Sequence, residues 1–180
     1  MFTQKQNKIS KNVILKGLEN IRMEGKDVMH SQVVMRGDMA PINLGTYVII
    51  KENVIIRPTF NKKHGQVTYV KMDIGDNVTI EPHCVISASS IGSNVHIGKN
   101  CVIGHRVVIK DNVKILDDSV IPPDTNIPSF TVFGGKPAQY LGELTESIAA
   151  INADLAKTYY RNFVGLQANT GAAPAQPAPS

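Results

Sequence analysis

The sequence predicts an all-β protein, a parallel β-helix of hexapeptide repeats that is followed by one α-helix. Two spacings of apolar residues support this prediction. Between Ile74 and Phe133 an apolar residue recurs every six positions, with one five-residue step from Ile86 to Ile91. A hexapeptide repeat of this kind is typical of a β-helix. After Gly142 the apolar spacing changes to three and four residues, which indicates one face of an α-helix.

Each hexad is expected to form one side of a triangular coil. Side chains alternate along a strand, so the first and fifth positions of a hexad point the same way, toward the core. Three hexads close one coil, and residues one coil apart should stack at about 4.8 Å. The second position, which is Gly in Gly75 and Gly92, is expected to permit the bend between flat sides. The expected columns are Ile74, Ile91, Ile109 and Ile127; Ile80, Ile97, Ile115 and Phe133; and Ile86, Ile103 and Ile121.

Two cysteines, Cys84 and Cys101, lie three hexads apart at inward fifth positions. The repeat therefore places them on neighbouring coils. A disulfide is geometrically conceivable there. A reducing compartment favours two buried thiols instead, and we adopt that interpretation.

The chain divides into four segments. Residues 1–12 are polar and are expected to lie outside the packed body or against a neighbour. Residues 13–141 are expected to form the β-helix, with an outward loop at about 57–73, where turn-forming residues interrupt the repeat. Residues 142–165 are expected to form the C-terminal helix, packed on the flank of the β-helix. Residues 166–180 are rich in Ala and Pro and are expected to be disordered.

The two ends of this arrangement carry specific expectations. The last coil should be an unpaired edge, because Pro122, Pro123 and Pro128 cannot donate hydrogen bonds to a further strand. The helix should face the body with one apolar stripe, which consists of Leu144, Ile148, Ile151, Leu155, Tyr159 and Phe163.

Composition excludes several classes of function. The formal charge is +4, and residues 1–73 carry 12 Lys and Arg against 6 Asp and Glu. These basic residues are scattered without interleaved aromatics, so a solvated surface is expected rather than a nucleic-acid site. The N-terminus has no apolar signal segment, and no apolar run reaches the ~18 residues of a membrane span. We therefore expect a soluble intracellular protein with no direct membrane insertion.

The segment from Val34 to Asp38 contains Arg-Gly-Asp and resembles the entry to the γ-class carbonic anhydrase family, in which three histidines bind a catalytic metal. The positions that match those ligands hold Arg57, Pro82 and Ser87. A catalytic zinc needs about three protein ligands and a water molecule. His83 is one residue away from a ligand position, which turns its side chain to the opposite face of a strand. We therefore predict no metal and no cofactor.

Hexapeptide acyltransferases, another family with this repeat, employ a histidine as general base at a subunit boundary. His64 and His105 are the only candidates for that role in this sequence. No acidic residue adjoins either one in sequence to orient its ring, so exposed histidines are the favoured interpretation. Arg36 and Asp38 are expected to form an ion pair rather than to take part in chemistry. The sequence therefore predicts no catalytic residue.

Residues 31–164 closely resemble the dynactin subunit 5 family. The most specific matches are the Arg57-Pro58 pair, the basic loop and the end of the helix. The residues that carry the resemblance include Arg36-Gly37-Asp38, Ile56-Arg57-Pro58, Phe60-Asn61-Lys62-Lys63, Pro122-Pro123, Phe130-Thr131-Val132-Phe133 and Tyr159-Tyr160. This resemblance implies a left-handed coil, an exception to the usual right-handed crossover.

The same resemblance implies a cytoplasmic, cytoskeletal location in the dynactin pointed-end complex. The implied partners are dynactin subunit 6 as a side-by-side β-helix, dynactin subunit 4, the pointed-end actin-related protein and cargo adaptors of dynein. The expected function is non-enzymatic: to cap the actin-like filament and to support cargo binding. Arg57, Lys62 and Lys63 are candidate partner-contact residues. The alternative is a γ-carbonic-anhydrase-like or acyltransferase homotrimer, which metal content and assembly state would distinguish.

Overall fold

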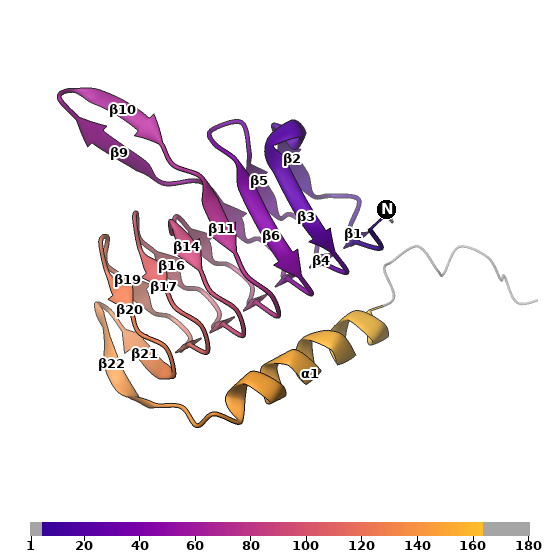
Figure 1. Ribbon diagram of the computed structural model, residues 1–180. Helices are drawn as coiled ribbons and strands as arrows, with labels where there is room; N and C mark the ends of the chain where they lie inside the picture. Colours follow the sequence, from indigo (N-terminus) through magenta and orange to yellow (C-terminus); the bar gives the residue numbers. More distant parts are fainter. Residues whose placement is uncertain (1–4, 164–180) are drawn as a thin grey trace, which may run out of the picture.

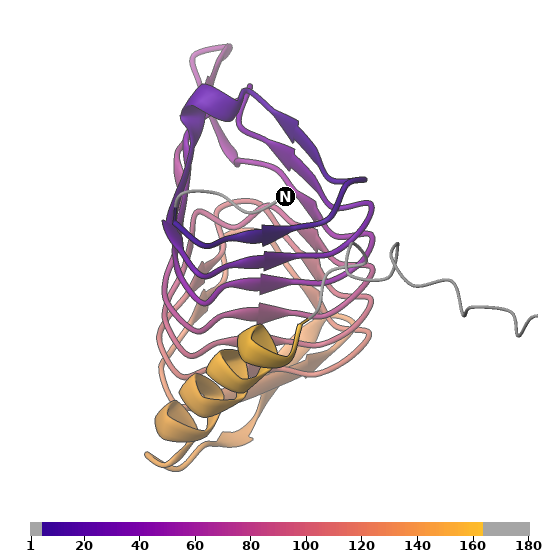
Figure 2. The same cartoon turned by 90° about the vertical axis from the view of Figure 1, so that its right-hand side faces the viewer.

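A computed structural model describes residues 5–163 of the chain. The chain winds through about six turns of a left-handed parallel β-helix. Three sheets, which we name A, B and C, form the flat sides of a triangular prism, and helix α1 (Ile148–Asn162) crosses one side (Figures 1 and 2). The predicted fold class is confirmed, including the helix on the flank.

Successive coils add one strand to each of the three sheets, apart from the β9–β10 hairpin and the terminal strand β22. Sheet A contains β1 (Lys8–Ile9), β4 (Val28–Met29), β7 (Ile49–Ile50), β12 (Thr79–Ile80), β15 (His96–Ile97), β18 (Lys114–Ile115), β21 (Thr131–Gly135) and β22 (Ala138–Glu143). Sheet B contains β2 (Ile14–Lys16), β5 (Val34–Arg36), β8 (Ile55–Ile56), β13 (Val85–Ile86), β16 (Val102–Ile103) and β19 (Val120–Ile121). Sheet C contains β3 (Ile21–Gly25), β6 (Ile42–Thr46), β11 (Met72–Ile74), β14 (Ser90–Ile91), β17 (Val108–Ile109) and β20 (Asn126–Ile127). A short 3-10 helix (Leu18–Asn20) and a hairpin of β9 (Phe60–Lys63) and β10 (Gln66–Tyr69) complete the fold.

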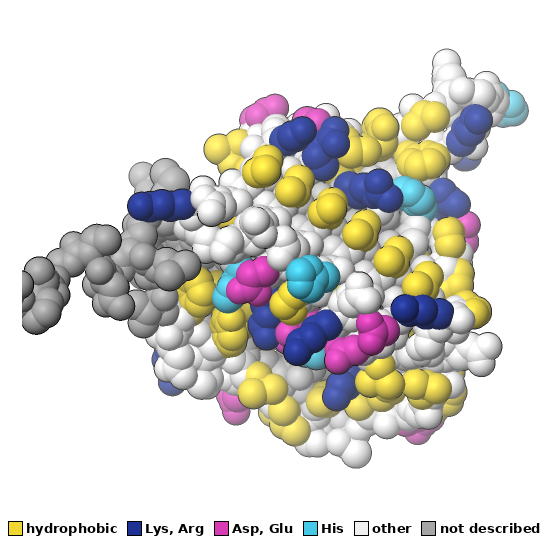
Figure 3. All heavy atoms as spheres, turned by 180° about the vertical axis from the view of Figure 1, so that it is seen from behind, with side chains coloured by type: hydrophobic (Ala, Val, Ile, Leu, Met, Phe, Trp, Pro, Cys, Tyr) yellow, Lys and Arg dark blue, Asp and Glu magenta, His cyan; other side chains and the backbone are white. Residues whose placement is uncertain are grey.

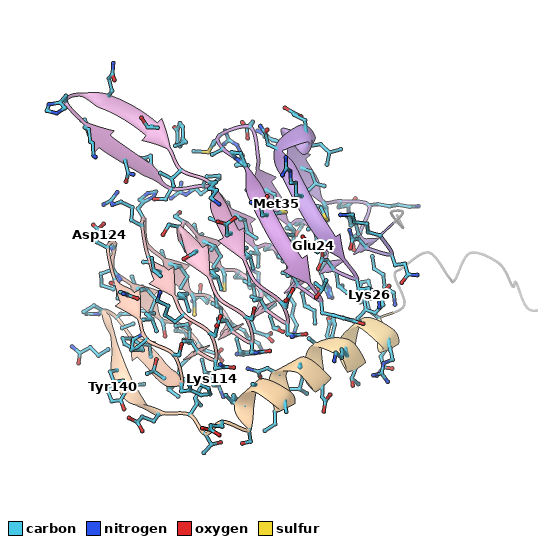
Figure 4. All side chains as sticks on the ribbon, viewed as in Figure 1. Glu24, Lys26, Met35, Lys114, Asp124 and Tyr140 are labelled. Atoms are coloured by element: carbon cyan, nitrogen blue, oxygen red, sulfur yellow. The ribbon has the colours of Figure 1, made fainter. Side chains whose placement is uncertain are left out.

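The inward side chains stack in the three columns that the repeat predicts. The register pairs Ile74, Ile91, Ile109 and Ile127 in sheet C, Ile80, Ile97, Ile115 and Phe133 in sheet A, and Ile86, Ile103 and Ile121 in sheet B. All of these isoleucines are buried, and Phe133 packs against them at the end of the core. Met35 belongs to the same core and points into the prism (Figure 4). Full burial of one such side chain contributes about 1.5–3 kcal/mol, so these columns are the main source of stability.

The bend between two sides is made at the fourth position of the hexad, whereas the second position was expected to permit it. The fourth residue adopts the left-handed conformation, with φ between 54° and 64°, in Asn77, His83, Asn94, Asn100, Arg106, Asn112, Asp118, Asp124 and Phe130. Asn and Asp are frequent here because their short polar side chains tolerate this region. Between His83 and Asn94 no residue has a positive φ, so the five-residue step omits this corner residue.

The glycines at second positions have a different role, which Gly98 illustrates. An added Cβ at Gly98 would lie 2.6 Å from the backbone nitrogen of Asp117 and 2.8 Å from the carbonyl carbon of Leu116, both on the next coil. Glycine is therefore required by the close approach of neighbouring coils rather than by a positive φ.

The two ends of the β-helix differ from expectation. Strand β1 pairs with β4, so the first coil already begins at Lys8, inside the segment that was expected to lie outside the body. At the other end, β22 pairs with β21 in an antiparallel hairpin and extends sheet A. Only sheets B and C end on strands that proline follows, Pro122 after β19 and Pro128 after β20. The hairpin is thus a third means of blocking further strand addition, beside the two prolines.

Helix α1 packs on the outer face of sheet A, where Ala156 is buried against Val28 and Ile49. The predicted stripe is wrong at its centre, because Ile151 is 49% exposed and Leu155 is 62% exposed. The small side chain of Ala156 lets the helix approach the sheet, which turns its contact face away from the larger residues. Tyr159, Tyr160 and Phe163 complete the contact. The predicted tail at 166–180 lies outside the described residues, as does the end of the predicted helix segment.

Polar contacts fix both ends of the helix to the body. The Asn152 side-chain amide donates to the carbonyl of Asn94 at 2.9 Å. Lys8 Nζ donates to the carbonyls of Tyr160 and Phe163, at 2.5 and 2.9 Å. A cation at the C-terminus of a helix also interacts favourably with the helix dipole. The helix therefore holds the first coil in place through Lys8.

Cys84 and Cys101 are buried free thiols in this structure. The thiol of Cys84 donates to the carbonyl of Gly98 at 3.0 Å, and that of Cys101 donates to the carbonyl of Leu116 at 3.1 Å. Each thiol thus reaches toward the next coil.

We expect Gly98→Ala to destabilise the fold, because its Cβ would overlap the backbone of the next coil. Overpacking of this kind costs about 1–3 kcal/mol. Urea unfolding measures the loss. Gly142→Ala is the matched control, since nothing lies within 4 Å of a Cβ added there. Equal unfolding midpoints for the two variants would contradict the close-approach explanation.

A buried carboxyl lies at the first corner of sheet A. Asp27 is fully buried, and its Oδ1 accepts the backbone N–H of Val48 at 2.9 Å. Its Oδ2 has no hydrogen-bond partner among the described residues. Loss of hydration on burial raises the pKa of Asp27 to about 7. The folded protein therefore keeps this carboxyl protonated at a pH where the unfolded chain ionises it.

This difference predicts a dependence of stability on pH. As the pH rises from 4 to 7, the unfolded chain loses the Asp27 proton first, so the folded state loses stability relative to it. A difference of about three pKa units corresponds to roughly 4 kcal/mol. Asp27→Asn cannot titrate. We compare the two proteins by the difference in unfolding free energy, wild type minus Asp27→Asn. We expect this difference to fall as the pH rises from 4 to 7 and to stay constant above pH 7. Parallel pH profiles for the two proteins would contradict the assignment.

Candidate partner-contact surface

The structure brings together two of the three positions that match γ-class metal ligands. Arg57 Nε donates to the hydroxyl of Ser87 at 3.1 Å, because Ile56 and Ile86 pair on adjacent strands of sheet B. Pro82 lies away from them, in the turn between β12 and β13, where its carbonyl accepts the N–H of Asn100. A guanidinium that donates to a serine hydroxyl offers no electron pair to a cation.

The remaining candidate near these positions, His83, is an exposed corner residue in the left-handed conformation. Within residues 5–163, no group of three His, Cys, Asp or Glu side chains is arranged to hold a metal ion. No helix in the same range is long and apolar enough to cross a membrane.

The predicted outward loop is the β9–β10 hairpin, which projects from the prism (Figure 1). Lys62 and Lys63 are both exposed on β9, and His64 lies at its turn. Because side chains alternate along a strand, the two lysines point to opposite faces of the hairpin. The structure therefore presents one lysine on each face instead of a paired basic site.

Arg106 fastens the base of this hairpin to the coils below it. Its guanidinium donates to both carboxylate oxygens of Asp124, at 2.6 and 2.8 Å, and to the carbonyl of Phe60 at 3.0 Å. Its backbone N–H donates to the hydroxyl of the buried Thr59 at 3.0 Å. The hydrogen bonds from the Arg106 guanidinium to the Asp124 carboxylate lower the pKa of Asp124. Asp124 lies at the outer edge of its coil, below the hairpin (Figure 4).

His105 lies in the same cluster. Its ring is 4.8 Å from that of Phe60, and its Nδ1 lies 3.4 Å from the hydroxyl of Thr59. Partial burial and the charges of Arg57 and Arg106 lower the pKa of His105. The ring is therefore neutral at physiological pH, but its hydrogen-bond partner is a hydroxyl. A carboxylate normally orients the ring of a general base, and among the described residues none is a hydrogen-bond partner of His105.

A second polar cluster, which the sequence did not reveal, joins α1 to the body. His30 Nδ1 lies 2.5 Å from a carboxylate oxygen of Glu52, and its Nε2 lies 2.6 Å from the hydroxyl of Tyr159. Glu81 accepts two hydrogen bonds from Lys51 and lies 3.3 Å from His96 Nε2. These side chains come from neighbouring coils, so only the coil register places them together. The Tyr159 hydroxyl and the Lys51 ammonium above the Tyr159 ring link this cluster to the helix.

The three outer faces differ in chemistry at the sixth position of the hexad. On sheet A the outward residues Val28 and Ile49 are covered by α1. On sheet C the outward positions are mostly polar, as in Asn43, Asp73 and Ser90. On sheet B they are all branched and apolar, and they pair in register as Ile14, Val34, Ile55, Val85, Val102 and Val120.

This row on sheet B, which we name the apolar strip, is open to solvent. Its members Ile14, Ile55 and Val102 are 50%, 39% and 42% exposed. Seen from behind, the molecule shows a diagonal row of hydrophobic side chains with Lys and Arg above it (Figure 3). The inward positions, which predict the fold, carry no information about this strip. The sequence signal for the strip is a branched apolar residue at the sixth position of every third hexad, the hexads that form sheet B.

Comparison with known proteins assigns the chain to a family. The family model of dynactin subunit 5 matches residues 1–169. Dynactin subunit 5 of Dictyostelium discoideum is 52% identical over 158 residues, which cover 88% of this chain and 80% of that protein. The chain belongs to the dynactin subunit 5 family.

Solved structures with the same fold are more distant. One is a hexapeptide transferase family protein from Anaplasma phagocytophilum, with a TM-score of 0.60 and 21% identity over 86% of this chain and 89% of that one. Another is the D94N mutant of AntD, an N-acyltransferase from Bacillus cereus, with a TM-score of 0.68 and 13% identity over 86% and 90%. At these identities the likeness shows the fold alone.

We expect Arg106→Ala to loosen the hairpin while the coils stay intact. The substitution removes the hydrogen bonds to Asp124 and Phe60 that hold the hairpin base. Hydrogen exchange of the β9–β10 amides should become about fivefold to tenfold faster. Lys51→Ala is the matched control, because Lys51 also donates two hydrogen bonds to one carboxylate, that of Glu81, but follows β7 of sheet A rather than a strand at the hairpin base. Faster exchange in both variants, or in neither, would contradict this role.

Proposed function

We propose that this protein is a non-enzymatic structural subunit of the dynactin pointed-end complex. Family membership supports a place in dynactin. The observation that carries the non-enzymatic part is the Arg57–Ser87 hydrogen bond, which occupies two of the positions where a γ-class enzyme holds its metal. The third position, Pro82, has no ligand atom in its side chain.

The mechanism that we propose is rigid presentation of contact surfaces. A flat side of the prism pairs with the β-helix of dynactin subunit 6, and an end coil contacts the end of the actin-like filament beside the pointed-end actin-related protein. Dynactin subunit 4 and the cargo adaptors of dynein complete the set of partners. The protein accordingly acts in the cytoplasm on the cytoskeleton, in dynein-driven transport along microtubules.

The alternative is a γ-carbonic-anhydrase-like or hexapeptide acyltransferase homotrimer. The solved transferase structures share the fold with this chain at 21% identity or less. His105, the better-placed base candidate, hydrogen-bonds to the hydroxyl of Thr59. We therefore favour the structural subunit.

Light scattering tests the proposal most directly. The purified chain is measured alone and after mixing with a dynactin subunit 6 homologue from the same source. We expect a monomer that becomes a one-to-one heterodimer. A stable homotrimer that contains bound metal would overturn the proposal in favour of the enzyme.

We propose further that Arg57, Lys62 and Lys63 contact acidic surfaces of the partners. Lys62→Glu/Lys63→Glu should weaken binding to at least one pointed-end partner by roughly threefold to tenfold, the range expected for two exposed charges. Isothermal titration calorimetry measures the Kd. Lys99→Glu/Lys110→Glu makes the same change of charge at exposed positions away from the hairpin. Unchanged affinity for every partner would refute the role of the two lysines.

A further inference from the structure

The β9–β10 hairpin is a small sheet that no further strand extends. Among residues 5–163, β9 and β10 pair only with each other, whereas sheets A, B and C contain six or eight strands each. All four residues of β10 are exposed, including Val67 at 51% and Tyr69 at 44%. A two-stranded hairpin is marginally stable in water, so the addition of a third strand would stabilise it.

The register of the hairpin leaves backbone groups of β10 on its outer edge. At the base, the Val70 N–H donates to the carbonyl of Thr59 at 2.9 Å, so Val70 bonds into the hairpin. In an antiparallel pair, residues that bond to the partner strand alternate with residues that do not. Thr68 therefore bonds to β9, and the N–H and C=O groups of Val67 and Tyr69 point outward.

The two edges of the hairpin differ in their protection against strand addition. Sheet edges are commonly blunted by lysine, proline or a bulge. The strand β9 carries Lys62 and Lys63, and the carbonyl of Phe60 at its base is already occupied by the Arg106 guanidinium at 3.0 Å. The strand β10 reads Gln-Val-Thr-Tyr, which has no charge and no proline and is rich in residues that favour strands.

The edge of β22 is antiparallel too, but it is irregular. Its register with β21 shifts between Val132 and Phe133, so this pair contains a bulge. A bulge disrupts the ladder and increases the local twist, which discourages a further strand. In contrast, β10 pairs with β9 in unbroken register over all four residues. Of these two edges, only β10 offers a regular row of hydrogen-bonding groups.

The charge of the hairpin indicates the chemistry of a strand that would pair with it. Lys62 and Lys63 make no ion pair among the described residues. Val67 and Tyr69 lie on one face of the hairpin, and Lys63 lies on the other. An added strand would lie two strand spacings from β9, about 10 Å, which long acidic and basic side chains can span. A complementary strand is therefore apolar on one face and acidic on the other.

We infer that the outer edge of β10 accepts an extended strand of a partner chain in which apolar and acidic residues alternate. The apolar residues pack beside Val67 and Tyr69, and the carboxylates lie on the face of Lys63. A second copy of this chain fits less well, because its β10 carries no carboxylate. This inference rests on the proposed function and deepens it, since it names an edge through which the subunit contacts a partner in its complex.

The test uses a short peptide of alternating Glu and Val, and a control peptide of alternating Lys and Val. Hydrogen exchange of the intact chain is followed by NMR. We expect the Glu–Val peptide to slow exchange of the Val67 and Tyr69 amides by about threefold or more, because both become donors to the added strand. The Lys–Val peptide should leave the exchange of both amides unchanged.

Val67→Pro removes an outward N–H, which a strand edge tolerates when that N–H faces solvent. We expect this variant to lose the protection that the Glu–Val peptide gives to Tyr69. Val67→Ala is the matched control, because it also loses the valine side chain but keeps the N–H, and it should retain the protection. The ring contact of Phe60 with Tyr69, whose centroids are 6.3 Å apart, reports whether the hairpin stays formed in both variants.

A charge variant keeps the inference testable if proline disrupts the hairpin. Lys63→Glu leaves the backbone unchanged and should exchange the preference, so that the Lys–Val peptide protects β10 and the Glu–Val peptide does not. Absence of protection by either peptide in the wild type, or equal protection by both, would overturn the inference. Protection without peptide that grows with protein concentration would assign the edge to a second copy instead.

The proposed function is tested separately by light scattering with the dynactin subunit 6 homologue. A heterodimer that forms while neither peptide protects β10 overturns this inference alone. A homotrimer with bound metal overturns the proposed function, whatever the peptides do.

Discussion

The spacing between neighbouring coils is the constraint on which this structure depends. Each coil forms backbone hydrogen bonds with the next, so the strands are held about 4.8 Å apart on all three sides. At that distance some second positions have no room for a Cβ, as the approach of Gly98 to the backbone of Asp117 shows. The chain must also turn between sides, which it does through left-handed residues such as Asn77 and Asn94.

The same constraint leaves the outward positions free. Inward columns must be apolar on every side, but a sixth-position residue touches only its neighbours in the row and whatever lies above them. Sheet A can therefore carry Val28 beneath a helix, sheet C can carry Asp73, and sheet B can carry the apolar strip. The inward columns determine the fold, and the outward rows determine the chemistry of the three faces.

This division explains how far the sequence could predict the structure. The repeat period was sufficient to place Ile74 above Ile91 and Ile80 above Ile97, because the period itself sets the register. It could not predict that Leu155 would be exposed, since the helix orientation depends on the contact of Ala156 with sheet A. The His30 cluster was hidden for a similar reason: its members come from five separate segments that meet only once coils and helix are assembled.

Polar side chains beside the inward columns are compatible with this fold. In a β-solenoid each coil is stabilised mainly by its neighbours, so the stability is a sum of local terms. The positions of Arg57 and Ser87 lie beside the columns that supply it, and substitution there leaves Ile56 and Ile86 paired and buried. A fold of this kind can therefore carry a guanidinium and a hydroxyl at these positions and remain a rigid prism. The contact function proposed for this subunit then depends on the shape and chemistry of its faces.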